Sequence, residues 1–392
     1  MTLHTPSTAA ELAAIVADAR ATRSPLAISG GGTRAGLGRP VQAAASLSTT
    51  KLTGITLYEP AELVIAARAG TPLAQVVETL AQRGQRLPFE PMDHRGLFGT
   101  AGEPTVGGVA AANVSGPARI NLGAARDSMI GLKFVNGRGE DIKTGGRVMK
   151  NVTGLDLTKT LAGSHGTLAV FHEVCFKVSP LAEREATLVI EGLSDALAIE
   201  ALSAALGSPF EPTAAAHLPA FDGARARTLL RIEGFGPMIT YRTGELAKLL
   251  KRFGALETLG EAESGPLWQA VRDAAFVAAG TDPVWRISVA PSKGAAVGTK
   301  LAALGGRYFY DWGGGLIWAA VPASGDASAA AIHALAKAAG GHATLVRAPD
   351  AVRLSVDVFD PPAAPLMTLQ RKLKASFDPD GILNPGHMYA GL

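Results

Sequence analysis

The sequence feature that most constrains this chain is a glycine-rich loop directly after a short apolar run. The run covers residues 25–28 and the loop covers residues 29–36, with glycine at positions 30, 31 and 32. Consecutive glycines allow backbone N–H groups to point the same way, which suits a pyrophosphate. No Gly-Lys-Ser/Thr follows, as a P-loop requires, and the third glycine of a Rossmann fingerprint is missing. Taken alone, a plain turn or flexible linker explains the loop equally well.

A second segment of small residues, at positions 105–116, strengthens the case for a ligand site. Gly107 and Gly108 lack side chains where a flat or bulky ligand could approach the backbone. Asn113 and Ser115 place hydrogen-bonding groups in an otherwise apolar stretch. The alternative for this segment is a tightly packed alanine and glycine turn in a core.

Length and composition exclude several classes of protein. A chain of 392 residues is long enough for two or three domains with buried cores. Cys175 is the single cysteine, in a pattern typical of a buried strand, so the chain holds no internal disulfide, cysteine-rich zinc site or self-ligated iron–sulfur cluster. Scattered basic residues and a net charge of +3 argue against nucleic acid binding. No apolar run reaches the roughly 18 residues of a spanning helix, so we expect no transmembrane segment.

The pattern of helices and strands changes near Pro180. The expected elements before it are a helix that begins with the capping pair Thr8 and Glu11, strands at 25–28 and 62–68, a helix at 71–82, and strand-like pieces at 129–136, 140–143 and 166–178. A tail at 361–392, with a predicted helix at 366–377, is too small to fold alone. We therefore expect it to pack back on the first domain.

After Pro180 an alternation of strands and helices occurs twice. The first pass is strand 186–190, helix 194–205, strand 228–233, helix 240–252 and strand 255–259. The second is strand 284–290, helix 293–304, strands 306–310 and 315–321, helix 327–338 and strand 342–346. Each pass resembles a ferredoxin-like β-α-β-β-α-β unit.

Four sequence blocks, in order along nearly the whole chain, resemble the vanillyl-alcohol oxidase superfamily of flavoproteins. The first block is Pro6-Ser-Thr together with residues 28–33, and the second is Thr105-Val-Gly-Gly together with residues 113–116 and 123–131. The third is Lys150-Asn-Val-Thr-Gly together with residues 155–159 and 163–167, and the fourth is residues 377–386. Within the superfamily the chain looks most similar to the FAD-binding subunits of bacterial glycolate oxidases. It is short, carries a similar segment at 341–349, and lacks the His-Gly-x-x-Gly-type motif of the catalytic members.

This resemblance implies an α+β fold, with a PCMH-type FAD-binding domain and a ferredoxin-like α/β cap domain. The implied domains are residues 1–179 for FAD binding, 180–346 for a cap of two ferredoxin-like units, and 347–392 for a C-terminal segment that packs back on the FAD domain.

The resemblance also assigns residues to an FAD site. Those expected at the pyrophosphate are Ser29, Gly30, Gly31, Gly32, Thr33 and Arg34. Those expected along the ribityl chain and isoalloxazine are Thr105, Val106, Gly107, Gly108, Asn113, Ser115 and Gly116. Arg126 and Asp127 match the family's Arg-Asp pair, although a plain ion pair explains them equally well. Asn384 lies in the flavin-contacting C-terminal segment. The first glycine loop lacks the histidine common in covalently flavinylated members, so noncovalent FAD is implied.

By resemblance, the chain is an FAD-dependent oxidoreductase of a glycolate oxidase complex. It would oxidise glycolate, a small 2-hydroxy acid, to glyoxylate together with a larger flavin subunit and an iron–sulfur subunit. Two alternatives stay open, a self-sufficient FAD-dependent 2-hydroxy acid dehydrogenase and a scaffold subunit that has lost flavin. The expected location is the cytoplasm, with peripheral attachment to the inner membrane through the partners.

The sequence assigns no catalytic base and no metal site. No two of the eight histidines have paired-base or metal-ligand spacing on one evident element. His165 stands where the family usually has glutamate, and a solvent-facing turn is favoured over a place near the flavin. Arg286 and Arg347 lie in apolar strands, where either could bind a carboxylate, but strand residues facing solvent are the favoured interpretation.

Overall fold

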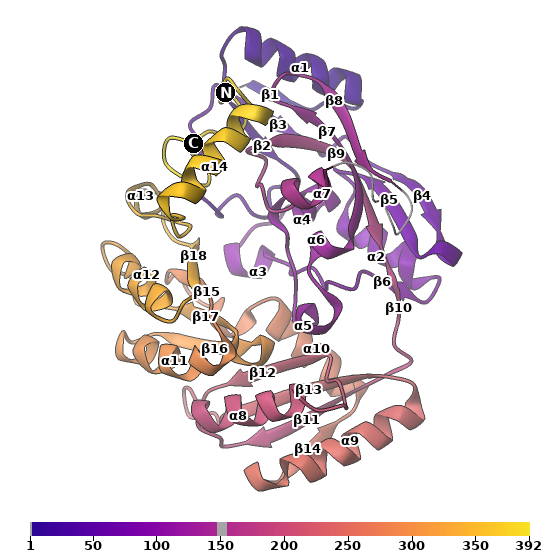
Figure 1. The fold of residues 1–392 in the computed structure, drawn as a ribbon, viewed down its shortest axis with the longest axis vertical. Coiled ribbons are helices and arrows are strands. Elements are labelled where there is room, and N and C mark those ends of the chain that lie inside the picture. The colour runs from indigo at the N-terminus through magenta and orange to yellow at the C-terminus, as the bar shows by residue number, and fades with distance from the viewer. Residues whose placement is uncertain (1, 147–154) are drawn as a thin grey trace.

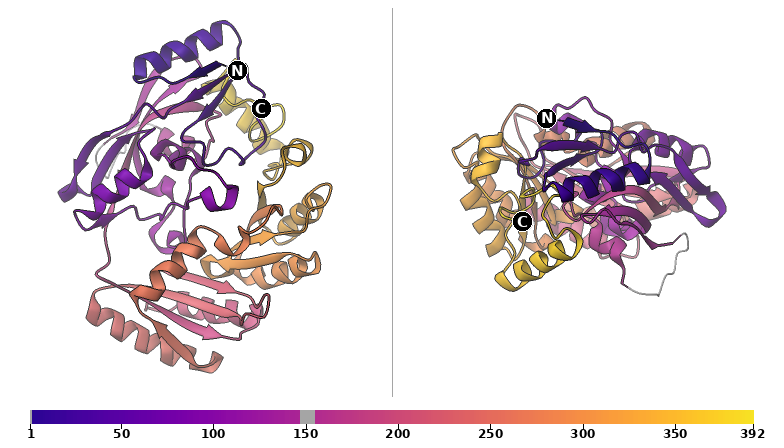
Figure 2. Two further views of the ribbon diagram at one scale, coloured as in Figure 1. Left: turned by 180° about the vertical axis from the view of Figure 1, so that it is seen from behind. Right: turned by 90° about the horizontal axis from the view of Figure 1, so that it is seen from above.

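The structure, a computed structural model, describes residues 2–146 and 155–392, so the predicted block at 150–154 lies outside it. The molecule is elongated, with the N-terminal half at one end and the segment after Pro180 at the other (Figure 1). The C-terminal tail returns along the side of the molecule to the N-terminal half (Figure 2).

Two sheets form most of the N-terminal half. The parallel sheet β1-β3-β2 contains β1 (Thr2–His4), β3 (Ala45–Ser48) and β2 (Leu26–Ser29). The antiparallel sheet β4-β5-β9-β7-β8 contains β4 (Ile55–Glu59), β5 (Val64–Arg68), β9 (Ala169–Lys177), β7 (Met129–Asn136) and β8 (Asp141–Gly145). The remaining elements are α1 (Ala9–Ala21), η1 (Pro60–Glu62), α2 (Leu73–Ala81), α3 (Arg95–Phe98), α4 (Val106–Ala112), α5 (Arg119–Leu122), α6 (Ala125–Ser128), α7 (Leu157–Leu161) and the antiparallel pair β6 (Gln85–Arg86) and β10 (Ser179–Pro180).

Helix α1 begins where the sequence predicts. The Thr8 hydroxyl accepts a hydrogen bond from the N–H of Glu11 at 3.1 Å, which satisfies one of the donors that a helix start leaves free. Leu12 and Val16, one turn apart, are fully buried, so the apolar stripe of the helix faces the core.

One eight-stranded sheet dominates the segment after Pro180, in the order β14-β11-β13-β12-β16-β17-β15-β18. Its elements are β11 (Arg184–Glu191), α8 (Asp195–Leu206), β12 (Ala214–Leu218), β13 (Arg227–Gly234), α9 (Gly236–Leu250), η2 (Lys251–Phe253), β14 (Leu256–Leu259), α10 (Glu261–Arg272), η3 (Ala275–Val277), β15 (Val284–Ser288), η4 (Pro291–Lys293), α11 (Gly294–Ala303), β16 (Arg307–Asp311), η5 (Trp312–Gly314), β17 (Leu316–Ala320), α12 (Ala329–Ala338) and β18 (His342–Arg347). Each half of the sheet has the strand order of a β-α-β-β-α-β unit, and the two predicted units meet where His217 of β12 pairs with Tyr310 of β16.

Two elements of this segment escape prediction from the sequence. Strand β12 reads Ala-Ala-Ala-His-Leu, which has the composition of a helix, yet it completes a sheet in which Ala214 and Ala216 are fully buried. Helix α10 contains Pro266, a residue that argues against a helix interior, but it buries Trp268 and Val271. In both cases tertiary packing overrides local propensity.

The tail contains α13 (Asp350–Ser355) and α14 (Ala364–Phe377) and is fastened to the N-terminal half. The N–H of Leu26 donates to the carbonyl of Ile382 at 2.8 Å. The buried ammonium of Lys374 pairs with Asp378 at 2.7 Å and donates to the carbonyl of Thr167 at 2.7 Å. The tail thereby brings its last turns to the end of β2, where the first glycine loop begins.

No helix among the described residues is both long enough and apolar enough to pass through a membrane.

Candidate cofactor-binding site

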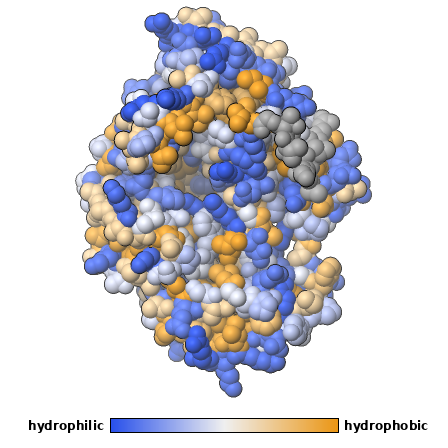
Figure 3. Space-filling model, in the orientation of Figure 1, coloured by the Kyte–Doolittle hydropathy of each residue, from blue (hydrophilic) through white to orange (hydrophobic). Residues whose placement is uncertain are grey.

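A cavity of about 340 Å³ lies where the two glycine-rich segments, β9 and the tail meet. Its volume falls in the usual range for small-molecule sites. The space-filling view shows the molecule hollowed in its upper half, with hydrophobic residues along the rim (Figure 3). The sequence-predicted residues that line the cavity are Ser29, Gly30, Gly31, Gly32, Thr33, Arg34, Thr105, Gly107, Gly108 and Asn384.

The first glycine loop passes very close to residues 103–105, which explains why glycine is needed there. A Cβ atom on Gly31 would lie 1.8 Å from the carbonyl oxygen of Glu103. A Cβ atom on Gly30 would lie 2.3 Å from the Thr105 hydroxyl oxygen. Gly32 has a φ of +76°, which side-chain-bearing residues rarely adopt.

The first glycine loop leaves backbone donors available to a ligand. Within the part of the chain that the structure describes, no hydrogen bond takes up the N–H groups of Gly31, Gly32 and Thr33. Successive unpaired N–H groups form a concave surface that suits an anion.

Arg34 adds a positive charge, and no carboxylate in the described part of the chain forms an ion pair with it. Its Nε donates to Nδ1 of His94 at 3.2 Å, and its Nη2 is buried without a hydrogen-bond partner among the described residues. Burial lowers the pKa of Arg34 to about 10, so the guanidinium stays charged at neutral pH. Burial, with Arg34 next, holds the pKa of His94 well below its usual value, so the imidazole is neutral. A buried cation with a free donor fits a phosphate-bearing group.

The other predicted site residues do not line the cavity. Val106 is buried inside α4. The Asn113 side chain accepts from the N–H of Arg126 at 2.9 Å, and the Ser115 hydroxyl accepts from the N–H of Ala125 at 3.1 Å. Gly116 donates its N–H to the carbonyl of Phe89 at 2.8 Å. These residues shape the turns between α4 and α6, and their part in cofactor binding stays a prediction.

Arg126 and Asp127 are both exposed, and the side chain of Asp127 has a local role. The Asp127 carboxylate accepts from the N–H of Ala124 at 2.8 Å, at the start of α6. Among the described residues no ion pair joins Arg126 to Asp127. The alternative interpretation of these two residues as a plain ion pair is therefore wrong. Their assignment to the cofactor stays a prediction.

Two histidines that the sequence did not assign to the site also line the cavity. His165 occupies a turn with a φ of +51°, as expected of a turn residue, but its ring points into the cavity wall. Its ring centroid lies 5.3 Å from that of Phe359 and 6.1 Å from that of His387. The residue is half-buried, and its ring lines the cavity against Phe359, so the turn is confirmed and the solvent-facing orientation is wrong. Burial lowers the pKa of His165 to about 3. The sequence signal was the histidine between two glycines, 163 and 166.

The two strand arginines differ from the solvent-facing residues that were expected. Arg347 donates to the carbonyl oxygens of Leu97 and Ala278 at 2.8 and 2.7 Å, and so joins β18 to α3 and η3. Arg286 is directed inward, and its guanidinium carbon lies 5.0 Å from the centroid of the Trp312 ring.

Comparisons with known proteins define the class. Residues 2–145 match the FAD binding domain family. The fold resembles that of 4-ethylphenol oxidase from Gulosibacter chungangensis, with a TM-score of 0.73 at 12% identity over 99% of this chain and 88% of that one. It also resembles p-cresol methylhydroxylase, with a TM-score of 0.70 at 13% identity over 98% of this chain and 88% of that one. The protein therefore has the PCMH-type FAD-binding fold.

A more specific relationship follows from sequence. The chain is 36% identical over 373 residues to the glycolate oxidase subunit GlcE of Escherichia coli K12, across 94% of both chains. The chain belongs to this GlcE family. It is also 32% identical to the glycolate oxidase subunit GlcD of Bacillus subtilis 168, but only across 40% of this chain and 32% of that one.

Proposed function

We propose that this chain is the FAD-binding subunit of a glycolate oxidase complex that oxidises glycolate to glyoxylate. The observation that carries the proposal is the likeness to GlcE along 94% of both chains, which includes the segment after Pro180 as well as the FAD domain. The cavity and its uncompensated Arg34 support it, because they offer an anionic cofactor a charged and partly preformed site.

The bound flavin supplies the electron-accepting ring for the oxidation. Residues 29–34 would hold its phosphates through free N–H groups and Arg34, and Asn384 is fixed nearby because its side chain accepts from the N–H of Ile28 at 2.7 Å. Ala111, Ala112 and Phe171 give the cavity an apolar wall that excludes water from a flat ring system.

The proposed partners are a larger flavin subunit and an iron–sulfur subunit. The chain's single cysteine cannot ligate a cluster by itself, so any cluster of the complex would belong to a partner. A peripheral place at the inner membrane, through those partners, is part of the same proposal.

The experiment that tests the function compares the chain alone with the chain plus its proposed partners. The visible flavin spectrum is recorded first, and glycolate or D-lactate is then added without air. We expect bound flavin that stays oxidised in the isolated chain and bleaches when the partners are present. Bleaching in the isolated chain would instead identify a self-sufficient dehydrogenase, and a colourless protein in both preparations would identify a scaffold.

We further expect the FAD to be noncovalent. Acid precipitation of the purified protein should leave the yellow cofactor in the supernatant, because no histidine lies in the first glycine loop. Among the described residues, His165 and His387 line the cavity. Flavin that stays with the pellet in the natural protein, and leaves it in a His165→Ala or His387→Ala variant, would show a covalent bond instead.

A further inference from the structure

The guanidinium of Arg34 is held at the cavity by one side-chain contact in the described part of the chain. Its Nε donates to Nδ1 of His94 at 3.2 Å. The carboxylate of Asp93 acts on Arg34 only through space, because it is paired with Arg95 at 2.8 Å. A guanidinium on a long side chain can turn, so the residue at the other end of this single hydrogen bond decides where its charge points.

His94 is itself fixed in place. The residue is 6% exposed, and its ring stacks on that of Phe98, with the ring centroids 5.9 Å apart and the planes 11° from parallel. Its carbonyl accepts from the N–H of Phe98 at 3.0 Å, at the first turn of α3. Because both the ring and the backbone are held, Nδ1 occupies a defined position beside Arg34.

The contact also determines which nitrogen of His94 carries the proton. A guanidinium always has a proton on Nε, so Nδ1 must present its lone pair to accept it. Burial, followed by the charge of Arg34, holds the pKa of His94 well below its usual value, so the ring is neutral and its proton is on Nε2. The carbonyl oxygen of Met92, 3.3 Å from Nδ1, would be a partner only if Nδ1 carried the proton instead.

A neutral acceptor suits an arginine that binds an anion. A carboxylate in the place of His94 would form an ion pair with Arg34 and compensate much of the charge that the cavity offers to a phosphate. The imidazole orients the guanidinium and leaves both its charge and Nη2, which has no partner among the described residues, for a ligand. Gly108 keeps the space beside the guanidinium open, since a Cβ atom there would lie 3.1 Å from Nη1.

The segment that carries His94 is tied to the C-terminal half of the chain. The N–H of Asp93 donates to the carboxylate of Asp273 at 2.9 Å. Arg347 of β18 donates to the carbonyl of Leu97 at 2.8 Å, at the other end of the same short segment. The place of the imidazole therefore depends on both halves of the molecule.

We propose that His94 is a positioning residue for the cofactor, whose Nδ1 lone pair aims the guanidinium of Arg34 into the cavity. The inference rests on the proposed function, in which residues 29–34 hold the FAD phosphates. It adds that FAD affinity depends on a histidine that does not itself line the cavity. Through the contacts of its segment, this histidine makes the affinity depend on the C-terminal half of the chain as well.

The test is an FAD titration into the flavin-free, full-length protein and two variants of His94. We expect His94→Leu, which has no acceptor, to weaken FAD binding about tenfold. His94→Asn should stay within about threefold of the natural protein, because its amide oxygen is an acceptor close to the place of Nδ1. The matched control is His217→Leu, a buried imidazole of β12 that bonds to Thr228 at 3.0 Å, and it should leave FAD affinity unchanged.

A double-mutant cycle separates positioning from a role in the fold. In an Arg34→Met background, His94→Leu should have no further effect on FAD affinity, because no guanidinium is left to aim. A structural role would instead lower the affinity equally in both backgrounds. Urea unfolding of the same flavin-free samples measures any loss of stability separately from the loss of affinity.

The state of Nδ1 is read in the natural protein by NMR with isotopically labelled histidine, assigned through bonds to the backbone of residue 94. We expect the signal of a nitrogen without a proton. A protonated Nδ1, normal FAD affinity in His94→Leu, or equal losses in both backgrounds would each overturn the inference. A natural protein that takes up no FAD would reject the proposed function and this inference with it, whereas normal FAD binding in every His94 variant rejects only the role of His94.

Discussion

Replacing Arg34 by methionine is expected to weaken FAD binding about 10- to 100-fold without lowering the stability of the flavin-free protein. The weakening follows from the loss of charge-assisted hydrogen bonds, each worth about 1.5–3 kcal/mol. Most substitutions of a buried arginine lower the free energy of unfolding. This one should not, because the Nη2 of Arg34 is buried with no partner among the described residues. Methionine removes that desolvated charge and keeps most of the side-chain volume.

Two measurements check this expectation. FAD titration into the flavin-free protein gives the affinity, and urea unfolding of the same preparation gives the free energy of unfolding. The matched control is Arg83→Met, an exposed arginine just after α2, which should change neither quantity. An Arg34→Met protein with normal FAD affinity would remove this residue from the cofactor site. A protein that loses more than about 2 kcal/mol of stability when flavin-free would show that Arg34 holds the fold instead.

How far the site could be predicted is clear from the two glycine loops. The first loop alone left an anion site and a plain turn equally open, and the structure places that loop, with Thr105 and Asn384, around one cavity. Asn113 and Ser115 looked equally suitable as donors, yet their side chains bond to the backbone of α6. A sequence shows that a side chain can form a hydrogen bond, but not whether the nearest acceptor or donor is the protein's own backbone.

The sequence could not predict which residues, distant along the chain, lie next to the charged and titratable side chains. In the sequence, Arg286 looks like any charged residue on the solvent face of a strand. Which face it lies on depends on the strands that pair with β15. Its face is set by pairing with β17 and β18, and its neighbour Trp312 comes from η5, the 3-10 turn between β16 and β17. His165 was likewise recognisable as a turn residue, but its closeness to Phe359 depends on the return of the C-terminal tail.

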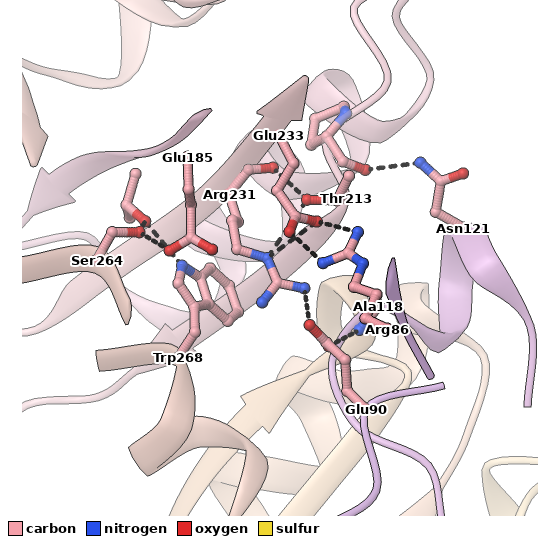
Figure 4. A network of polar contacts seen from close by, with 12 residues as sticks. Arg86, Glu90, Ala118, Asn121, Glu185, Thr213, Arg231, Glu233, Ser264 and Trp268 are labelled. Carbon is pink, nitrogen blue, oxygen red and sulfur yellow. Dashed lines mark hydrogen bonds and ion pairs between the residues drawn. The ribbon is translucent and has the colours of Figure 1, made fainter. Parts of the chain in front are cut away.

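Replacing Arg231 by methionine is expected to lower the free energy of unfolding by about 3–5 kcal/mol at neutral pH. Arg231 is buried between Glu90, at 2.7 Å, and Glu233, at 3.7 Å (Figure 4). Removing one partner of a buried ion pair leaves the other charge uncompensated, and this usually costs more than the pair contributes. The matched control, Arg225→Met, breaks an exposed pair with Glu191 and should cost less than about 1 kcal/mol.

The pH dependence separates this electrostatic effect from a simple loss of packing. Burial alone would raise the pKa of Glu233, but Arg231 and then Arg86 hold that pKa below the usual value of 4.5. A carboxyl with a depressed pKa stabilises the fold above its unfolded-state pKa, and this stabilisation is lost as the pH falls through the folded-state pKa. The difference between the natural protein and Arg231→Met should therefore be largest near pH 7 and shrink below about pH 4.5.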